Sequence, residues 1–386
     1  MCESPDRPAP LEFRPVRLLA PILLAALALA ASASAGRPRV DARAFLVQNG
    51  ANGEIVYEHD ARERLPIASI TKLMTALVVV ERAPLDARVV VSASAVGVPG
   101  STIGLRAGER LTVRELLEAS LIQSANDAAN ALAAHVGRGS IPRFVELMNR
   151  RARLLGLADT HFTRPDGLDD AGHLSSARDV TKLARVAMQR PAIRTIVAKR
   201  RETIAGGRSL HTWNDLLGTF PGVVGVKTGH TSAAGWSEVA AARGAGFTIY
   251  ATLLGGSTRN GRNDDLRELL RYGLSRYRPF AVISAGRIYG RVSTEFGRKP
   301  IEAVATRALV RVVRVDRPLV ERVVVRTVVT LPIRRGAALG EVRIYDRGAL
   351  IGRRRLVAAR AVGRPGLSGR TAWYAGRALS QIRGWL

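Results

Sequence analysis

The segment Ile67–Ala76, with the sequence IASITKLMTA, decides how the rest of the chain is interpreted. It follows Pro66 and leads into an apolar run that ends at Val80, which predicts a helix that begins near Ser69. Lys72 lies three residues after Ser69, so the two side chains share a helix face and the amine can reach the hydroxyl. A lysine amine can accept a proton when neighbours and burial lower its pKa. The pair therefore predicts a serine nucleophile with a lysine base.

Lysine is scarce in this chain, which makes its presence beside Ser69 informative. Lysine and arginine together number 59, and only five of these are lysines. Arginine supplies the positive charge almost everywhere else, but a guanidinium cannot be deprotonated in a protein. Two of the five lysines fall in the motifs that carry the predicted chemistry. The lysines are Lys72, Lys182, Lys199, Lys227 and Lys299.

Two further short motifs follow in chain order. Ser124-Ala125-Asn126 presents a hydroxyl and an amide from a loop or helix start, and Lys227-Thr228-Gly229 ends a predicted strand. At the strand end, a cation and a hydroxyl can bind a carboxylate, and a glycine lets a substrate backbone approach closely. Each motif alone is common at ordinary caps and turns. The three motifs in this order indicate a serine acyl-enzyme.

These motifs resemble those of the penicillin-binding and serine β-lactamase superfamily, and the chain is most similar to its low-molecular-mass D-alanyl-D-alanine carboxypeptidases. The resemblance covers residues 40–277 well, and the rest of the chain resembles the C-terminal half of the same carboxypeptidases more loosely. Beyond the three motifs, it rests on Met148-Asn149, Leu155-Gly156, Thr160-His161-Phe162, Gly167-Leu168-Asp169, His173, Ser176-Ala177, Asp179, Asn214–Leu217 and Gly225–Thr231.

The resemblance implies a two-step acyl transfer. Ser69 is expected to attack the carbonyl between the two terminal D-alanines of a peptidoglycan stem peptide, while Lys72 takes its proton. The backbone N–H groups of Ser69 and His230 are expected to form the oxyanion hole. Ser124 is expected to pass a proton to the leaving D-alanine, and water then releases the acyl-enzyme. The resemblance thus implies three catalytic side chains, those of Ser69, Lys72 and Ser124.

Substrate binding is implied for five further residues. Asn126 is expected to hold the peptide amide, and Lys227 and Thr228 the terminal carboxylate. Gly229 and His230 complete this strand edge. The reaction needs no metal ion and no organic cofactor. β-Lactam antibiotics are expected to acylate the same serine, because their ring presents a similar strained amide and carboxylate.

Some family-like positions are expected to have structural roles, and one departs from the family pattern. His173 and Asp179 are interpreted as loop and helix-cap residues, since acidic side chains often cap helix starts. Arg164 stands where the family usually has an asparagine, so the local loop is expected to differ.

The first 35 residues predict export. Arg14 and Arg17 precede an apolar run, Leu18–Ala31, and Ala33-Ser34-Ala35 then offers small residues for cleavage. A positive flank, a short apolar stretch and such a site are typical of a secretory signal peptide. The protein is therefore expected in the cell envelope, on the outer side of the cytoplasmic membrane.

The fold class expected is α+β. Residues 36–278 are expected to form a serine β-lactamase/penicillin-binding-like catalytic domain, with an antiparallel sheet and a helical cluster. Its strands are predicted at Ala44–Val47, Ile55–Tyr57, Val223–Lys227, Trp236–Ala242 and Thr248–Leu254, and its helices at Ser69–Val80, Val113–Val136, Phe144–Leu155, Ala177–Met188 and Leu266–Tyr277.

The C-terminal part predicts a small all-β domain over residues 279–366 and a short amphipathic helix over residues 367–386. The β-domain is valine-rich, with arginines alternating along the strands and Pro or Gly at the turns. The terminal helix places tryptophan, tyrosine and leucine near one face with arginines beside them. This pattern is typical of a helix that lies on an anionic membrane surface.

Net charge is the unusual quantity in the composition. The chain has 59 basic and 32 acidic residues, a formal charge of +27, and residues 281–386 alone carry 22 basic and 6 acidic side chains. Such an excess suggests an anionic partner. Nucleic acid is not expected, because it does not explain the signal peptide and the β-domain lacks interleaved aromatic residues.

Several alternatives share the same nucleophile. A class A β-lactamase uses a glutamate to activate the deacylating water, and between the second and third motifs only Glu146 and Glu202 are available. A D,D-endopeptidase or transpeptidase differs only in the acceptor. A non-catalytic envelope-binding protein is the alternative from another class, and the complete set of motif residues argues against it.

Overall fold

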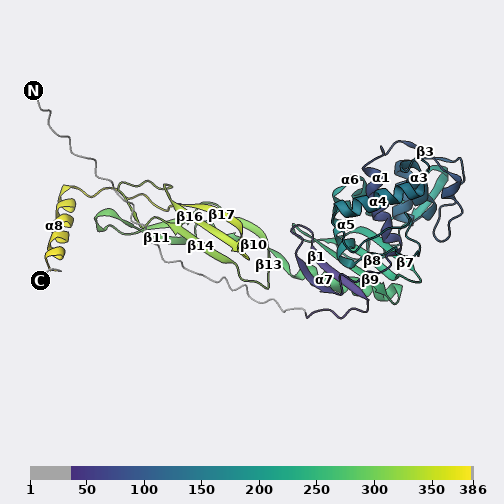
Figure 1. The fold of residues 1–386 in the computed structure, drawn as a ribbon. Helices are drawn as coiled ribbons and strands as arrows, with labels where there is room; N and C mark the ends of the chain where they lie inside the picture. The colour runs from purple at the N-terminus through teal and green to yellow at the C-terminus, as the bar shows by residue number, and fades with distance from the viewer. Residues whose placement is uncertain (1–35, 384–386) are drawn as a thin grey trace, which may run out of the picture. The chain divides into compact units, whose positions relative to one another are not determined.

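The computed structural model describes residues 36–383. Within these residues the chain forms two compact units that divide between Arg278 and Pro279 (Figure 1). The predicted signal peptide, residues 1–35, lies outside the described residues, as do residues 384–386 of the predicted terminal helix.

The first unit is built around a five-stranded antiparallel sheet, as the sequence predicts. Its strands lie in the order β2-β1-β9-β8-β7, so the first strands of the unit pair directly with the last ones. The strands are β1 (Ala44–Asn49), β2 (Ile55–His59), β7 (Val223–Thr231), β8 (Gly235–Arg243) and β9 (Thr248–Gly256). Two short hairpins accompany the sheet: β3 (Arg88–Val90) with β4 (Arg110–Thr112), and β5 (Arg201–Ile204) with β6 (Arg208–His211).

Helices cover both faces of this sheet. On β9, Ile249 packs against α7 (Arg259–Ser275), whereas Thr252 lies 2.6 Å from Thr181 of α5 (Ala177–Gln189). Strand residues an odd number of positions apart point to opposite faces. Helix α7 therefore covers one face and α5 the other, as Figure 1 shows.

A helical cluster lies beyond α5, with α1 (Lys72–Val80) at its centre. Every side chain from Lys72 to Val79 is fully buried, so this helix contacts protein on all sides. A 3₁₀ turn, Ala68–Thr71, leads into it. The helices around α1 are α2 (Val113–Glu118), α3 (Asn126–Val136), α4 (Ile141–Leu154), α5 and α6 (Pro191–Val197).

The prediction of one helix over Val113–Val136 is wrong. Helix α2 ends at Glu118, a π-helical turn follows, and Ser124 has a left-handed backbone (φ +64°) before α3 begins at Asn126. Such a conformation costs a residue other than glycine about 1–2 kcal/mol. The apolar spacing continues through the break because α2 and α3 bury against the same core, so periodicity alone could not reveal it.

Helix α7 begins seven residues before the predicted start at Leu266. Its first residue is Arg259, and the Thr258 side chain caps it by accepting the backbone N–H of Gly261 at 3.0 Å. The first two turns are polar, so the apolar pattern becomes visible only near Leu266. This difference matters because the early turns carry two arginines of the pocket described below.

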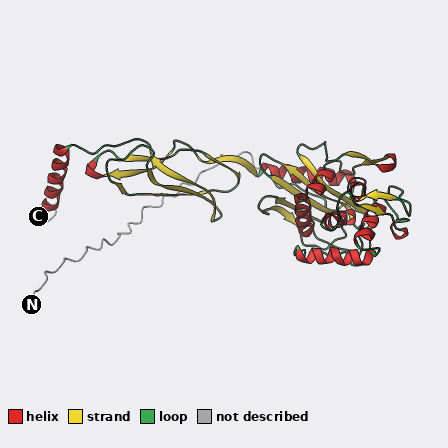
Figure 2. Cartoon of the chain, turned by 90° about the horizontal axis from the view of Figure 1, so that it is seen from above, coloured by secondary structure: helices red, strands yellow, loops and turns green. Residues whose placement is uncertain are grey.

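The second unit is all-β with one terminal helix, as predicted (Figure 2). A six-stranded sheet has the order β14-β16-β17-β12-β11-β15, and β10 pairs with β13. Alternating valine, isoleucine and leucine side chains form its core. The strands are β10 (Tyr277–Ile283), β11 (Ile288–Thr294), β12 (Ile301–Ala305), β13 (Leu309–Arg314), β14 (Val320–Val325), β15 (Val328–Val329), β16 (Ala338–Asp346) and β17 (Ala349–Ala358).

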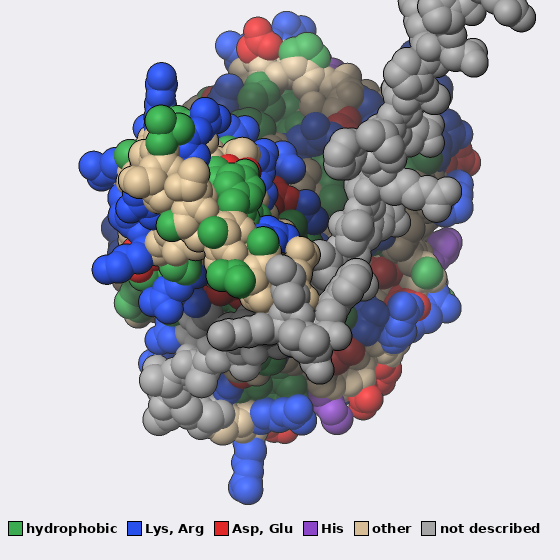
Figure 3. Space-filling view, turned by 90° about the vertical axis from the view of Figure 1, so that its left-hand side faces the viewer, with side chains coloured by type: hydrophobic (Ala, Val, Ile, Leu, Met, Phe, Trp, Pro, Cys, Tyr) green, Lys and Arg blue, Asp and Glu red, His purple; other side chains and the backbone are tan. Residues whose placement is uncertain are grey.

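The terminal helix, α8 (Leu367–Arg383), is largely exposed. Its contact with the β-domain is aromatic: the ring of Trp373 lies 5.4 Å from that of Phe296. Leu367, Tyr374 and Leu379 are 76%, 60% and 63% exposed. Figure 3 views this end of the chain and shows basic side chains around the hydrophobic ones. Within residues 36–383, no helix has the length and apolar character needed to cross a membrane.

Candidate active site

Ser69 and Lys72 meet at the N-terminal end of the buried helix. The Lys72 Nζ lies 2.7 Å from the Ser69 Oγ, the contact that the three-residue spacing predicts. Two carbonyl oxygens complete its surroundings, Asn126 Oδ1 at 2.7 Å and the backbone oxygen of Asp166 at 2.6 Å. A neutral amine has two N–H groups and one lone pair. It can therefore donate to both carbonyls and accept the hydrogen of the Ser69 hydroxyl.

The environment of Lys72 favours that neutral form. Complete burial lowers the pKa of Lys72 from 10.5 to about 7, because the charged form loses its hydration. The negative charge of Asp166 opposes this shift, and the positive charge of Arg164 adds to it. A base with a pKa near 7 is well matched to proton transfer at neutral pH.

Ser124 and Lys227 form a second hydroxyl and amine pair at the same pocket. The Lys227 Nζ donates to the Ser124 Oγ at 2.9 Å and to the backbone oxygen of Thr228 at 2.9 Å. The left-handed backbone of Ser124 turns its hydroxyl out of the helix line towards β7. Burial lowers the pKa of Lys227 well below its usual value, and the nearby charge of Lys72 adds to this effect.

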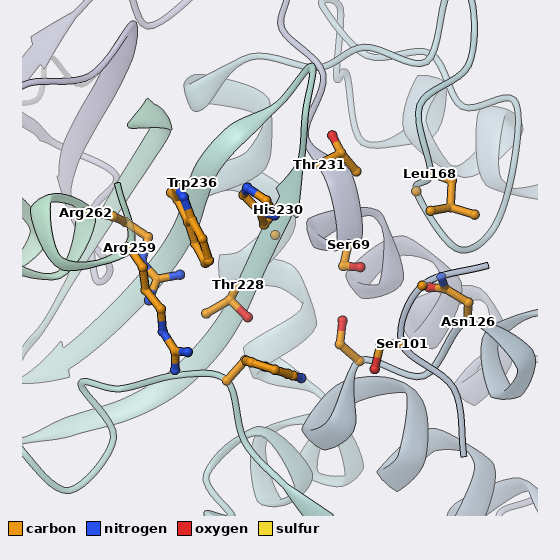
Figure 4. Close-up of a pocket in the computed structure, with 15 residues that line it drawn as sticks. Ser69, Ser101, Asn126, Leu168, Thr228, His230, Thr231, Trp236, Arg259 and Arg262 are labelled. Carbon is orange, nitrogen blue, oxygen red and sulfur yellow. The ribbon is translucent and has the colours of Figure 1, made fainter. Parts of the chain in front are cut away.

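A pocket of about 290 Å³ opens above these groups. Figure 4 shows Ser69 between two walls, with Thr228, His230 and Trp236 on one side and Ser101, Asn126 and Leu168 on the other. The structure brings all eight predicted site residues together here. Lys72 and Lys227 are buried beneath the residues that line the pocket. The other six line the pocket: Ser69, Ser124, Asn126, Thr228, Gly229 and His230.

Gly229 and Gly167 allow the backbone to pass close to the nucleophile. A Cβ on Gly229 would lie 2.7 Å from the Ile67 carbonyl oxygen and 3.2 Å from the Ser69 nitrogen. A Cβ on Gly167, which has φ +82°, would lie 2.1 Å from the Ala68 carbonyl oxygen. Strand β7 and the segment around Gly167 can therefore flank the Ser69 turn only without side chains at these points.

A Gly229→Ala substitution is expected to lower the rate of acylation by fluorescent penicillin about 100-fold, the scale of loss from a displacement of about 1 Å at a reacting group. The added methyl must push β7 away from the Ser69 turn. Gly363→Ala is the matched control, because its Cβ meets open space. A Gly229→Ala protein that labels at the wild-type rate would show that this close approach is not needed.

The sequence interpretation missed several pocket residues. Arg259 stacks on the ring of Trp213 at 5.3 Å and forms a bidentate pair with Asp215 (2.6 and 2.8 Å). Arg262 is fully buried and its Nε lies 3.2 Å from a Glu238 carboxylate oxygen. Arginines are so frequent in this chain that two more drew no attention. Their spacing of three residues at the start of a helix was the available signal.

His173 and Asp179 form hydrogen bonds to neighbouring segments, and the side chain that caps α5 is that of Ser176, not of Asp179. The His173 Nε2 lies 2.7 Å from the Thr71 Oγ1, and its Nδ1 accepts the Thr163 backbone N–H at 3.0 Å. Asp179 is in the first turn of α5 and accepts the Thr160 hydroxyl at 2.7 Å. His173 thus holds the turn that carries the nucleophile, and Asp179 holds Thr160 against the start of α5.

Comparison with known proteins identifies the family to which this geometry belongs. Residues 31–258, more than half of the chain, match the family described as D-alanyl-D-alanine carboxypeptidase. The chain belongs to this family. It is accordingly a serine hydrolase, as the sequence predicts. A relative in the same family, the D-alanyl-D-alanine carboxypeptidase DacD of Salmonella typhimurium, is 30% identical over 353 residues, which cover 87% of this chain and 90% of the relative.

Solved structures of similar proteins confirm the fold class. Penicillin binding protein 5 from Haemophilus influenzae is 27% identical, with a TM-score of 0.63 over 85% of this chain and 99% of that chain. Penicillin-binding protein D2 from Listeria monocytogenes, solved in its ampicillin-bound form, is 31% identical, with a TM-score of 0.56 over 61% of this chain and 98% of that chain.

Proposed function

We propose that this enzyme removes the terminal D-alanine from peptidoglycan stem peptides through an acyl-enzyme on Ser69. The observation that carries the proposal is the contact of 2.7 Å between the buried Lys72 amine and the Ser69 hydroxyl at the base of an open pocket. The pair formed by Ser124 and Lys227 borders the same pocket and supplies a second proton carrier.

In the acylation step, the Ser69 oxygen bonds to the scissile carbonyl carbon while its proton passes to the Lys72 nitrogen. The developing oxyanion is stabilised by the backbone N–H groups of Ser69 and His230. The close approach of β7 to the Ser69 nitrogen at Gly229 supports this arrangement. Ser124 then delivers a proton to the leaving D-alanine nitrogen and receives in turn the proton that Lys72 took from Ser69, so that the step balances, while Lys227 holds the Ser124 hydroxyl by its hydrogen bond.

The substrate carboxylate lies along the β7 wall in this proposal. Thr228 offers a hydroxyl there, and Arg259 and Arg262 add positive charge on the same side of the pocket. Lys227 is 2% exposed, so it acts from behind Ser124 through its hydrogen bond to that hydroxyl. Asn126 faces the peptide amide from the opposite wall. β-Lactams acylate the same serine, which the ampicillin-bound relative supports.

The positions of the available glutamates disfavour a class A β-lactamase. Glu202 pairs with Lys199, on the hairpin formed by β5 and β6. Glu146 is on α4, in a surface hollow that it shares with Asn149 and Arg150. The pocket around Ser69 is lined by other side chains.

The test of the proposed function is incubation of the full-length protein with a pentapeptide stem, followed by mass spectrometry of the products. Loss of one alanine residue is the expected result. A cross-linked dimer would support a transpeptidase, and cleavage of a cross-linked dimer would support an endopeptidase. Covalent labelling by fluorescent penicillin separates all of these from a non-catalytic binding protein.

We place this reaction outside the cytoplasmic membrane. The signal-peptide pattern in residues 1–35 supports export, and the substrate would lie in the same compartment. In this organisation, residues 36–278 carry the chemistry. Residues 279–366 form the β-rich domain, and the segment of residues 367–386, which the structure describes as α8 up to Arg383, binds the membrane.

The proposed membrane contact rests on α8. Its exposed Leu367, Tyr374 and Leu379 offer an apolar surface of modest size, and Arg377 lies 5.2 Å above the Trp373 ring. A single helix of this kind binds a membrane reversibly, helped by attraction to anionic lipid. The positive charge of the neighbouring β-domain adds to this attraction.

Deletion of residues 369–386 is expected to abolish co-sedimentation with anionic lipid vesicles and to leave hydrolysis of a soluble peptide unchanged. Full-length protein should bind partially and dissociate in 1 M salt, where the Debye length falls to about 3 Å. Vesicles of neutral lipid are the matched control and should bind less. Equal sedimentation of the truncated and full-length proteins would show that α8 is not the anchor.

A further inference from the structure

An ion pair lies directly behind the Lys72 amine. Arg164 donates from Nε to Asp166 Oδ1 at 2.6 Å and from Nη2 to Oδ2 at 3.1 Å, which makes the pair bidentate. The backbone oxygen of the same Asp166 accepts from the Lys72 Nζ at 2.6 Å. Asp166 therefore contacts the Arg164 guanidinium through its carboxylate and the Lys72 amine through its backbone carbonyl.

The Asp166 carboxylate is buried and ionised. It is 1% exposed, and it also accepts from the Asn130 Nδ2 at 3.0 Å and from the Leu168 backbone N–H at 3.1 Å. Burial by itself raises the pKa of this carboxyl, but the Arg164 and Leu168 hydrogen bonds outweigh it and hold the pKa below its usual value. A buried negative charge requires a counter-charge, and Arg164 and Lys72 are both near enough to supply it.

The other charged groups that face Lys72 are few. Asp127, on α3, favours the charged lysine, and the backbone N–H of Leu105 donates to its carboxylate at 3.0 Å. Burial holds the pKa of Lys227, from β7, well below its usual value, and the charge of Lys72 is near enough to lower it further. His173 lies behind Thr71, and burial lowers its pKa to about 4, so it is neutral at pH 7. The protonation state of Lys72 therefore depends on how the charge of Asp166 is neutralised.

We propose that Arg164 is a positioning residue for acylation, which neutralises Asp166 and thereby leaves the Lys72 amine unprotonated and able to accept the Ser69 proton. The inference rests on the proposed function of Lys72 as the base. Arg164 binds the Asp166 carboxylate and acts through that residue. In its absence, Lys72 becomes the nearest counter-charge and is held as an ammonium that cannot accept a proton.

The test is the pH dependence of acylation by fluorescent penicillin, measured on full-length protein between pH 5 and pH 10. In the wild type, the rate should rise through a midpoint at about pH 7, where Lys72 loses its proton. In Arg164→Gln the midpoint should move to higher pH by on the order of one unit. The rate at pH 6 then falls about tenfold while the alkaline plateau is retained.

Asp166→Asn should move the midpoint in the opposite direction. It removes the negative charge that favours the Lys72 ammonium and leaves the Arg164 cation unpaired. The double variant Arg164→Gln/Asp166→Asn removes both charges and should return the midpoint close to the wild-type value. A purely structural role would lower the rate at every pH and would not produce shifts of opposite sign.

Two further variants serve as controls. Arg164→Lys keeps the charge and should keep the midpoint. Arg178→Gln removes another bidentate pair, that between Arg178 and Glu58 on β2 (2.9 and 3.2 Å), and should leave the midpoint unchanged.

A midpoint in Arg164→Gln equal to that of the wild type would overturn the inference. If Arg164→Gln does not fold, a midpoint in Asp166→Asn below that of the double variant supports the inference, and equal midpoints overturn it. A wild-type protein that takes no label at any pH would overturn the proposed function as well. Midpoints that do not move in labelled proteins would overturn only the role of Arg164.

Discussion

A Ser69→Ala variant is expected to give no covalent band with fluorescent penicillin and to lose hydrolysis of the pentapeptide by about 10⁴-fold or more. The substitution removes the atom that forms the acyl bond, and the serines beside it cannot replace it. Ser124, which lines the same pocket, has its hydroxyl 2.9 Å from Lys227, a contact that fits a proton carrier for the leaving group.

The same variant should remain folded, because it deletes one half-buried oxygen atom whose partner is the neutral Lys72 amine. Thermal unfolding should therefore differ by no more than a few degrees from that of the wild type. Ser275→Ala is the matched control: its hydroxyl donates to the Tyr272 carbonyl at 2.8 Å at the end of α7, and its loss should leave labelling intact. Covalent labelling of Ser69→Ala would show that another residue is the nucleophile.

Lys72→Arg is expected to lower acylation on the order of 10³-fold, close to the effect of Lys72→Ala. The reason is the permanent charge of a guanidinium, which cannot accept the Ser69 proton at any pH of the assay. Size adds to this effect, since the Lys72 Nζ is enclosed by three oxygen atoms at 2.6–2.7 Å. Penicillin labelling and peptide hydrolysis should fall together.

The pH profile distinguishes the loss of the base from general damage. In the wild type, the free amine is present above the Lys72 pKa of about 7 and disappears as the pH falls through it, so acylation should decline on the acid side. The residual acylation rate of Lys72→Arg should not show this decline towards acid pH. Lys182→Arg, at an exposed lysine, should behave as the wild type. If Lys72→Arg kept most of the acylation rate, the role of Lys72 as base would be wrong.

Much of this protein can be predicted from the sequence because the decisive relations are local. The contact between Ser69 and Lys72 follows from helix geometry, in which residues three apart are neighbours. The strands β1, β2, β7, β8 and β9 follow from short, largely apolar runs bounded by turns, and the valine-rich C-terminal part follows from a similar pattern. The order of the three motifs identifies the family and hence the chemistry to expect.

The tertiary structure decided what depends on residues distant in the chain. Lys72 meets Asn126 and Asp166 across sequence separations of 54 and 94 residues, and Ser124 meets Lys227 across 103 residues. Local pattern carries no information on such contacts. The left-handed backbone at Ser124 could not be predicted from the sequence either. The packed core on both sides of the break between α2 and α3 holds this conformation in place, and no glycine marks the position.

The same distinction applies to charge. A sequence shows that Lys72 is a lysine, but its pKa is set by complete burial and by the charges that the fold brings near it. Arg259 and Arg262 look like any of the many arginines of this chain until α7 places them in the pocket wall. The sequence by itself determined which residues can perform the chemistry. The tertiary structure decided which of them meet and in what protonation state, because burial and electrostatic environment are properties of the packed chain.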